Sequence, residues 1–196
     1  MAGLKHSQTV SRESPSPGDK SAAPRSAPAW LDLSESAFLR DCRLEAFRGP
    51  GPGGQKRNKT SNSIRLTHLP TGVSVMAGES RSQLENKRRV IRRLKLRLAA
   101  LVRRPIDVRG LEPPAWFAQV VQLGRLAISH RNPHHARTAA LVLDLLAQRD
   151  GTVGDVAALM GVTTSSVIKF LAQEPELWSA ANEIRKRAGT PPLRLR

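Results

Sequence analysis

The chain has 196 residues, with 32 lysines and arginines against 16 acidic residues, so its net charge is 32 − 16 = +16. A charge of this size predicts a polyanionic partner, with nucleic acid favoured over an anionic membrane surface. No apolar run reaches the roughly 20 residues that span a bilayer. The 4% aromatic content argues against a base-stacking platform for single strands. The single cysteine, Cys42, excludes an intramolecular disulfide and a cysteine-based zinc cluster.

The N-terminal segment, residues 1–29, is rich in Ser, Pro and Ala and has no periodicity, which predicts a disordered tail. It lacks the apolar stretch of a secretory signal, so we expect a cytoplasmic protein without membrane association. Arg12, Arg25 and the many serines leave a transit peptide open as the alternative, although Glu13 and Asp19 weaken it.

Regular structure is expected from Trp30 onward. Ser34 is a candidate N-cap for a short helix over residues 35–41. Polar and apolar residues then alternate over residues 43–47, which predicts a strand.

A second and a third strand are predicted over residues 63–69 and 73–76, because alternation resumes on both sides of a Pro-Thr-Gly turn at residues 70–72. Ile64, Leu66 and His68 would lie on one side of this hairpin. The pattern therefore predicts a small antiparallel sheet.

A long helix is predicted from about residue 82 to residue 102. Its expected apolar face consists of Leu84, Ile91, Leu94, Leu98 and Leu101. Residues 81–104 also carry ten basic side chains against one acid, Glu85. One helix has room for a core stripe and a phosphate-facing stripe, and the alternative is a solvated basic face.

The C-terminal half is predicted to be all-helical, after a proline-bracketed linker at residues 105–114. Helices are expected near residues 115–128, 136–149, 153–160, 164–172 and 175–188. Residues 155–170 resemble a helix-turn-helix, with Ala157 at the close approach, Gly161 in the turn, and Val167 and Phe170 packing inward. Thr163 to Ser166 would then begin the second helix and contact phosphate or bases. The alternative is a packing unit that reads no groove.

Three histidines, His130, His134 and His135, cluster around Pro133. A metal site would need a fourth ligand and a defined geometry, so we expect no metal here. A helix-start loop that is cationic near RNA is the preferred interpretation.

The most informative segment is residues 48–60, where three glycines in five positions, Gly51 to Gln55, precede a basic run. Glycine is favoured where the backbone must reach positive φ or approach a partner closely. The segment lacks the Gly-Lys-Ser/Thr ending of a P-loop, and no Gly-x-Ser-x-Gly motif is present in the chain. We therefore expect a mobile loop that contacts a polyanion. The alternative is a plain flexible turn or a phosphate-binding turn.

Residues 41–102 resemble the catalytic domain of class-I peptide chain release factors. The resemblance is carried by Gly53-Gly54-Gln55 with its flanking residues and by blocks further along the chain at the family's spacing: Arg48 to Pro52, Asn58 to Thr60, Arg65 to His68, Pro70 to Val73, Arg81 to Gln83, and Asn86-Lys87. Lys56 and Arg57 depart from the family, since many members carry His and an apolar residue there.

The resemblance implies hydrolysis of the ester between a nascent chain and the P-site tRNA, in the peptidyl transferase centre of the large ribosomal subunit. Gly53, Gly54 and Gln55 would be the catalytic residues. The backbone N–H of Gln55 would stabilise the oxyanion, and its side chain would confine the site to water. No cofactor is implied. The residues expected to contact RNA are Arg48, Lys56, Arg57, Asn58, Lys59, Thr60, Arg65, Arg81, Lys87, Arg88 and Arg92.

Release factors of this class also carry a domain that reads stop codons, and we expect none in the residues before position 41. The protein should therefore act without a stop codon, like stand-alone rescue hydrolases, or depend on a partner for recognition. We expect a monomer that binds ribosomal RNA and peptidyl-tRNA. Two alternatives are a nucleic-acid-binding regulator with a vestigial loop and a ribosome-binding factor that catalyses nothing.

The expected fold class is α+β. A disordered tail (1–29) precedes a release-factor-like catalytic domain (30–104), a linker (105–114), and an all-α domain with a helix-turn-helix-like unit (115–196).

Overall fold

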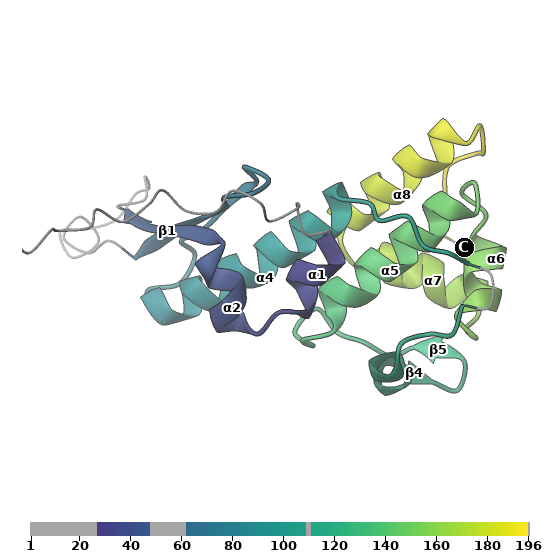
Figure 1. Cartoon of the computed structure of the whole chain (residues 1–196), viewed down its shortest axis with the longest axis horizontal. Helices are drawn as coiled ribbons and strands as arrows, with labels where there is room; N and C mark the ends of the chain where they lie inside the picture. Colours follow the sequence, from purple (N-terminus) through teal and green to yellow (C-terminus); the bar gives the residue numbers. More distant parts are fainter. Residues whose placement is uncertain (1–26, 48–61, 109–110, 196) are drawn as a thin grey trace, which may run out of the picture.

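The structure is a computed structural model, and it describes residues 27–47, 62–108 and 111–195. It is elongated, with strand β1 toward one end of the long axis and helices α6 and α7 toward the other (Figure 1). The elements in chain order are α1 (Ala27–Asp32), α2 (Glu35–Arg40), β1 (Cys42–Phe47), β2 (Ser63–His68), β3 (Ser74–Ala77), α4 (Gln83–Leu101), η1 (Ala115–Val120), β4 (Val121–Gln122), β5 (Arg125–Leu126), α5 (His135–Gln148), α6 (Val153–Leu159), α7 (Thr164–Leu171) and α8 (Pro175–Arg187).

The first three strands form an antiparallel sheet in the order β1-β2-β3. As predicted, Ile64, Leu66 and His68 are all buried on one side of it. The turn between β2 and β3 needs Gly72, whose φ is +69°. Ser34 caps α2 as predicted, because its Oγ accepts a hydrogen bond from the N–H of Ala37 (3.3 Å).

The buried face of α4 differs in part from the predicted one. Ile91, Leu94 and Leu98 are buried, but Leu84 and Leu101 are 59% and 53% exposed. The buried row runs instead at a spacing of four residues through Asn86, Val90, Leu94 and Leu98. The face that meets the sheet is therefore rotated from the one that the leucines alone predicted, and a polar residue begins it.

Helices α5 to α8 confirm the prediction within two residues at each end, but the helix predicted over residues 115–128 is wrong. A short 3₁₀ helix, η1, is followed there by a two-stranded ribbon, β4-β5. Leu123 and Gly124 form the tip of the ribbon with positive φ values of 48° and 68°. Two successive left-handed residues end any helix, so this half is not all-helical.

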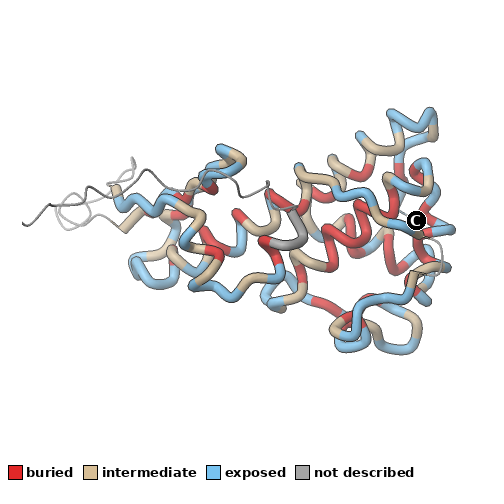
Figure 2. The backbone as a smooth tube through the Cα atoms, in the orientation of Figure 1, coloured by how far each residue is buried: buried red, intermediate tan, exposed pale blue. Residues whose placement is uncertain are grey.

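Two hydrophobic cores share helices α1 and α4. Leu98 packs in the core between α4 and the sheet, whereas its neighbour Ala99 packs in the second core, around α5. Trp30 and Leu31 of α1 divide in the same way. The buried residues form a nearly continuous run along α5 (Figure 2).

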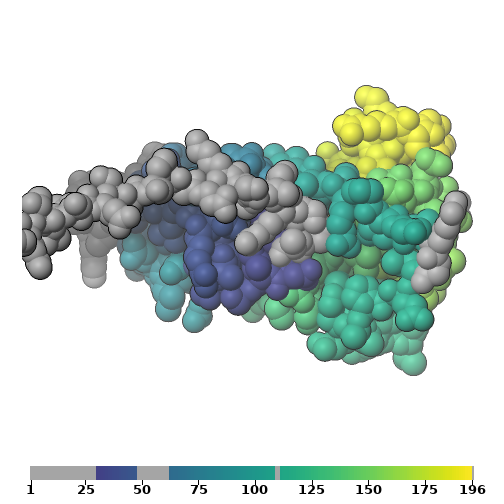
Figure 3. Space-filling view, viewed as in Figure 1, coloured from purple at the N-terminus to yellow at the C-terminus, as the bar shows by residue number. Residues whose placement is uncertain are grey.

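The expected linker follows the surface of the second core. Ile106, Val108 and Leu111 are partly buried against it. The last helix, α8, projects from the side of the molecule (Figure 3). The chain then turns back, and the N–H of Leu193 donates to Asn182 Oδ1 of α8 (2.7 Å).

Within the described residues, no single helix is long and apolar enough to cross a membrane. The bent pair α6 and α7 meets that criterion by length and composition alone. Its apolar side chains Val156, Val167 and Phe170 are buried in the second core.

Candidate functional site

The glycine-rich segment connects two paired strands. β1 and β2 are antiparallel, and Phe47 at the end of β1 is opposite Ser63 at the start of β2. The intervening chain therefore leaves β1 and enters β2 at the same end of the two strands. The predicted catalytic residues Gly53, Gly54 and Gln55 lie outside the described residues. So do six of the predicted RNA-binding residues, namely Arg48, Lys56, Arg57, Asn58, Lys59 and Thr60.

The sheet end from which this segment leaves carries an aromatic and cationic pair. The guanidinium carbon of Arg65 lies 5.4 Å from the ring centroid of Phe47. Arg65 also points Nη2 at Met76 Sδ (3.6 Å) on β3. Arg65, a predicted RNA-binding residue, therefore lies on the exposed face of the sheet and contacts both β1 and β3.

A buried amide holds the other end of the segment. Asn86, in the first turns of α4, is fully buried. Its Nδ2 donates to the carbonyl of Asn62 (2.7 Å) and to that of Ser80 (2.8 Å), and its Oδ1 accepts from the N–H of Ser80 (3.0 Å). We call Asn62, Ser63, Ser80 and Asn86 the loop stem. The sequence pattern placed Asn86 in a family block but did not predict its burial.

A close backbone approach adds to the loop stem. A Cβ atom on Gly78 would come within 2.4 Å of Ser63 Oγ and 3.1 Å of Ser63 Cβ. Contacts under 3 Å are essentially absent among real Cβ atoms, so the first residue of β2 would have to shift. Glycine at position 78 therefore lets the β3–α4 turn pack directly on the start of β2.

The arginines of α4 divide into two groups. Arg93 pairs with Glu79 (2.6 Å), and Arg89 pairs with Glu85 and, at 3.8 Å, with Glu79. Arg88 and Arg92 are exposed and form no ion pair with any acid in the described part of the chain. Arg81 is also exposed, and Lys87 is half-buried. The free cations lie at i and i+4 and therefore share one face of the helix.

His68 is a core residue at the far end of the sheet. Its ring stacks on Phe38 and meets Trp30 edge-on, with centroids 5.9 Å and 4.3 Å away, and Nδ1 lies 2.8 Å from Thr71 Oγ1. Burial lowers the pKa of His68. Burial also raises the pKa of the nearby Cys42 thiol to about 11, so that cysteine is no nucleophile at neutral pH.

Two of the three histidines near Pro133, where the sequence suggested a cationic loop, contact aromatic rings of the protein. His134 stacks on Trp116 with centroids 5.3 Å apart. His135 is buried against Phe170, and burial lowers its pKa. The described residues include no group of three or more His, Cys, Asp or Glu side chains that could hold a metal ion.

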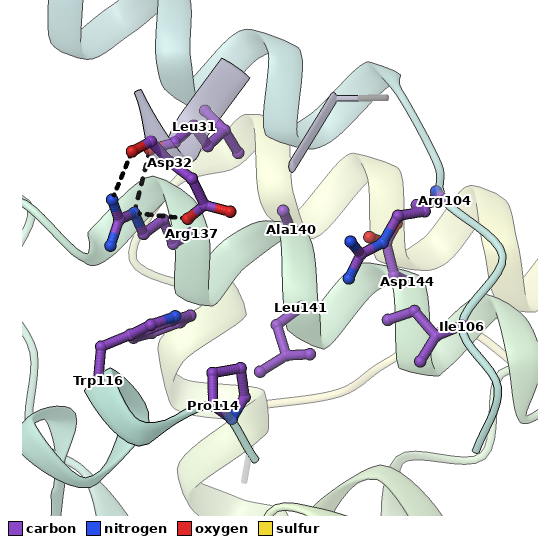
Figure 4. Close-up of a pocket in the computed structure, with 10 residues that line it drawn as sticks. All are labelled: Leu31, Asp32, Arg104, Ile106, Pro114, Trp116, Arg137, Ala140, Leu141 and Asp144. Atoms are coloured by element: carbon purple, nitrogen blue, oxygen red, sulfur yellow. Dashed lines mark hydrogen bonds and ion pairs between the residues drawn. The ribbon is translucent and has the colours of Figure 1, made fainter. Parts of the chain in front are cut away.

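A small pocket lies beside the second core, between α1, α5 and the chain at Arg104, Ile106, Pro114 and Trp116 (Figure 4). On one side, Arg137 Nε donates to the carbonyl of Leu31 (3.0 Å) and pairs with Asp32 (3.1 Å). On the other, the carboxylate of Asp144 pairs with Arg103 (3.0 Å) and accepts the N–H of Arg104 (3.1 Å). Burial outweighs these partners and raises the pKa of Asp144 to about 6. The polar contacts of this pocket join α5 to α1 and to the residues that follow α4.

Helices α6 and α7 meet at 108° across a short turn in which Gly161 has a φ of +63°. Thr163 caps α7, because its Oγ1 accepts from the N–H of Ser166 (3.3 Å). Ser166 is buried and accepts the N–H of Leu126 from the β4-β5 ribbon (2.7 Å). One of the four residues predicted to contact nucleic acid is therefore used inside the protein.

Residues 37–108 match the family model of the RF-1 domain. The chain is 49% identical over 76 residues to peptide chain release factor 1 of Parafrankia sp., covering 39% of this chain and 21% of that protein. It is 47% identical over 73 residues to peptide chain release factor 1 of Streptomyces griseus, covering 37% and 20%. The protein of the same name in Acidothermus cellulolyticus is 44% identical over 70 residues, covering 36% and 19%.

The chain therefore spans about a fifth of the length of the curated relatives that it matches. The matched residues include the loop stem, all of α4 and the whole three-stranded sheet. Residues 37–108 of this chain are a domain of the class-I peptide chain release factor family.

Proposed function

We propose that this protein releases nascent peptides from the ribosome by hydrolysing the ester of P-site peptidyl-tRNA. The observation that carries the proposal is the match of residues 37–108 to the RF-1 domain, with Gly53-Gly54-Gln55 in the segment that joins β1 to β2. The relatives are named peptide chain release factors.

The proposed chemistry needs few groups from the protein. Water attacks the ester carbonyl, and negative charge develops on the carbonyl oxygen. A preorganised donor at that oxygen is often the largest catalytic contribution, and the backbone N–H of Gln55 is the proposed donor. A backbone donor depends on conformation, which is why Gly53 and Gly54 precede it. The Gln55 side chain excludes nucleophiles larger than water.

Binding is proposed to come from the basic side chains around the segment and along α4. Ribosomal RNA offers a dense array of phosphates, and each neutralised phosphate releases counterions. Arg88 and Arg92 form no ion pair with the acids of the described residues and can take this role, whereas Arg89 and Arg93 are already paired with acids. The partners in this proposal are therefore the RNA of the large subunit and the P-site peptidyl-tRNA, on cytoplasmic ribosomes, with the protein acting as a monomer.

We further propose that release by these 196 residues does not need a stop codon. The match to the relatives is confined to one domain, and the remaining described residues fold against it as a helical unit. Ribosomes with labelled peptidyl-tRNA in the P site and a stop codon, a sense codon or no codon in the A site test this directly. Equal release from all three supports the proposal, and release with stop codons alone contradicts it.

A second candidate function is nucleic-acid binding by α6 and α7. It is favoured by their 108° crossing and by the exposed Thr163, Thr164 and Ser165 at the start of α7. Comparing the affinity of the protein for bare duplex DNA with its affinity for stalled ribosomes separates the two functions. Tighter binding to DNA, without peptide release, would favour the regulator.

A further inference from the structure

We propose that Asn86 is a positioning residue for peptide release, because its side-chain amide fixes the point at which the chain re-enters β2 after the Gly-Gly-Gln segment. This inference rests on the proposed function. Asn86 is proposed to touch no reacting atom and to act through the backbone of Asn62.

The burial of Asn86 requires an explanation beyond packing. The residue begins the row that continues with Val90 and Leu94, whose apolar side chains pack in the first core. A buried amide without partners costs stability, so a polar residue at such a position is retained only where its hydrogen bonds are made. All three hydrogen bonds of the Asn86 side chain go to backbone atoms outside α4.

Those backbone atoms belong to two different connections. Ser80 lies between β3 and α4, and Asn62 immediately precedes β2. One side chain therefore ties the end of the Gly-Gly-Gln segment to the turn that starts α4. Asn86 donates twice and accepts once, which an aspartate or a leucine of similar size cannot do.

The position of Asn62 matters because it lies seven residues after Gln55. The opposite end of the segment is held by the pairing of Phe47 with Ser63. Fixing both ends reduces the conformations that the intervening residues can sample. Catalysis by a positioned donor is sensitive to small displacements, and a shift of about 1 Å can cost on the order of 100-fold in rate.

The inference is tested by measuring peptide release by the full chain from ribosomes with labelled peptidyl-tRNA and an empty A site. Asn86→Asp keeps the shape and the acceptor but removes both donors. The control is Asn182→Asp, the same chemical change at the partly buried residue of α8 that accepts the N–H of Leu193. We expect Asn86→Asp to lower the saturated release rate about 10- to 100-fold with an unchanged half-saturating concentration, and the control to change neither.

Amide hydrogen exchange provides a readout that does not depend on release. Exchange should accelerate in residues 62–66 and 80–86 of Asn86→Asp and stay unchanged in α5 to α8. If Asn86→Asp does not fold, Asn86→Ala, which buries no charge, replaces it with the same expected results. A folded variant with the wild-type release rate overturns the inference.

Failure of the proposed function would look different. A wild-type chain that releases no peptide while Asn86→Asp shows the expected local exchange would mean that the anchor exists but positions no such reaction. A variant that loses ribosome binding rather than rate would also overturn the positioning role.

Discussion

The proposed chemistry should be most sensitive to an added methyl group at Gly54. We predict that Gly54→Ala lowers the saturated rate of peptide release on the order of 100-fold, because an alanine is poorly tolerated in the conformations that glycine adopts and the oxyanion donor is displaced. Ribosome binding should survive, since the cations that supply it lie elsewhere. Co-sedimentation with ribosomes and single-turnover release measure the two quantities separately.

Gln55→Ala is the informative companion. It leaves the backbone donor in place, so its loss of rate should be the smaller of the two. Its effect should appear mainly in selectivity, as faster release with added small amine nucleophiles relative to water. Release by Gly54→Ala at the wild-type rate would rule out the mechanism.

Single residues show where sequence reasoning reached its limit. The alternation over residues 63–68 was enough to place His68 on the buried side, but it did not show that the ring is enclosed by Trp30 and Phe38. Asn86 was missed as a buried anchor because a polar residue near a helix start is usually solvated. Its partners, Asn62 and Ser80, come from other connections, and only the folded chain brings them together.

At the scale of elements, α4 offers a matched comparison between free and paired arginines. We predict that the double substitution Arg88→Gln with Arg92→Gln weakens ribosome binding and lowers the slope of log affinity against log salt by about one for each arginine. The matched control is Arg89→Gln with Arg93→Gln, which removes the same charge from cations that are already paired with Glu79 and Glu85.

The control should lose less affinity and less of the salt slope than the first pair. Equal losses for the two pairs would mean that the net charge of the helix, and not its free face, attracts the RNA.

The joint between α4 and α5 should respond to pH through Asp144. Its pKa of about 6 in the folded state lies above the ordinary 3.8, so the folded state takes up a proton that the unfolded state does not bind in this range. The resulting stabilisation is complete below the unfolded pKa and is lost as pH rises through about 6. We therefore predict that wild type gains about 1 kcal/mol over Asp144→Asn between pH 8 and pH 5.

Urea unfolding of both proteins at each pH measures this difference. His68 and His135 have lowered pKa values and act in the opposite direction, but they are common to both proteins and cancel. A difference in stability that does not change with pH would show that Arg103 keeps Asp144 ionised throughout.

Local signals sufficed for elements whose patterns agree with their surroundings. The cap at Ser34, the turn at Gly72 and the apolar row of α4 from Ile91 to Leu98 are of this kind. The helix predicted after Pro114 was wrong, although apolar residues there have a helical spacing. The backbone conformation overrides that spacing, because Leu123 is left-handed and fully exposed. Non-glycine residues rarely adopt that conformation, so no propensity rule indicated it.

At the scale of the whole molecule, the two cores should unfold together. The three tryptophans make this measurable, because Trp30 packs in the first core while Trp116 and Trp178 pack against the second. We predict that a variant retaining Trp30 and a variant retaining Trp116 and Trp178 show the same midpoint when thermal unfolding is followed by fluorescence. Phenylalanine replaces the removed tryptophans in each.

Circular dichroism of both variants provides the control for any change in stability that the substitutions cause. Midpoints that differ between the fluorescence and circular dichroism of one variant would show that the cores unfold independently.

The role of the C-terminal half cannot be tested cleanly by truncation after Arg104. Such a cut exposes Ala99 of the second core and removes Asp144, the partner of Arg103. Substitutions on the exposed surface are the better test of whether residues 115–196 contribute to ribosome binding. Lys169→Gln, in the last turn of α7, and Arg125→Gln, in β5, change exposed residues and should weaken binding without changing the saturated rate.

The division of Leu98 and Ala99 between two cores has a consequence for protein engineering. Successive residues of an α-helix are separated by about 100° and 1.5 Å, so the angle between the cores is set by helix geometry and not by a tether. Leu94 and Leu98 alternate with Leu96, Ala99 and Ala100 over the same two turns. A chimaera that moves the C-terminal half onto another release domain must therefore transplant this stretch of α4 in phase. One inserted residue would swing one half around the other, whatever the length of the connection after it.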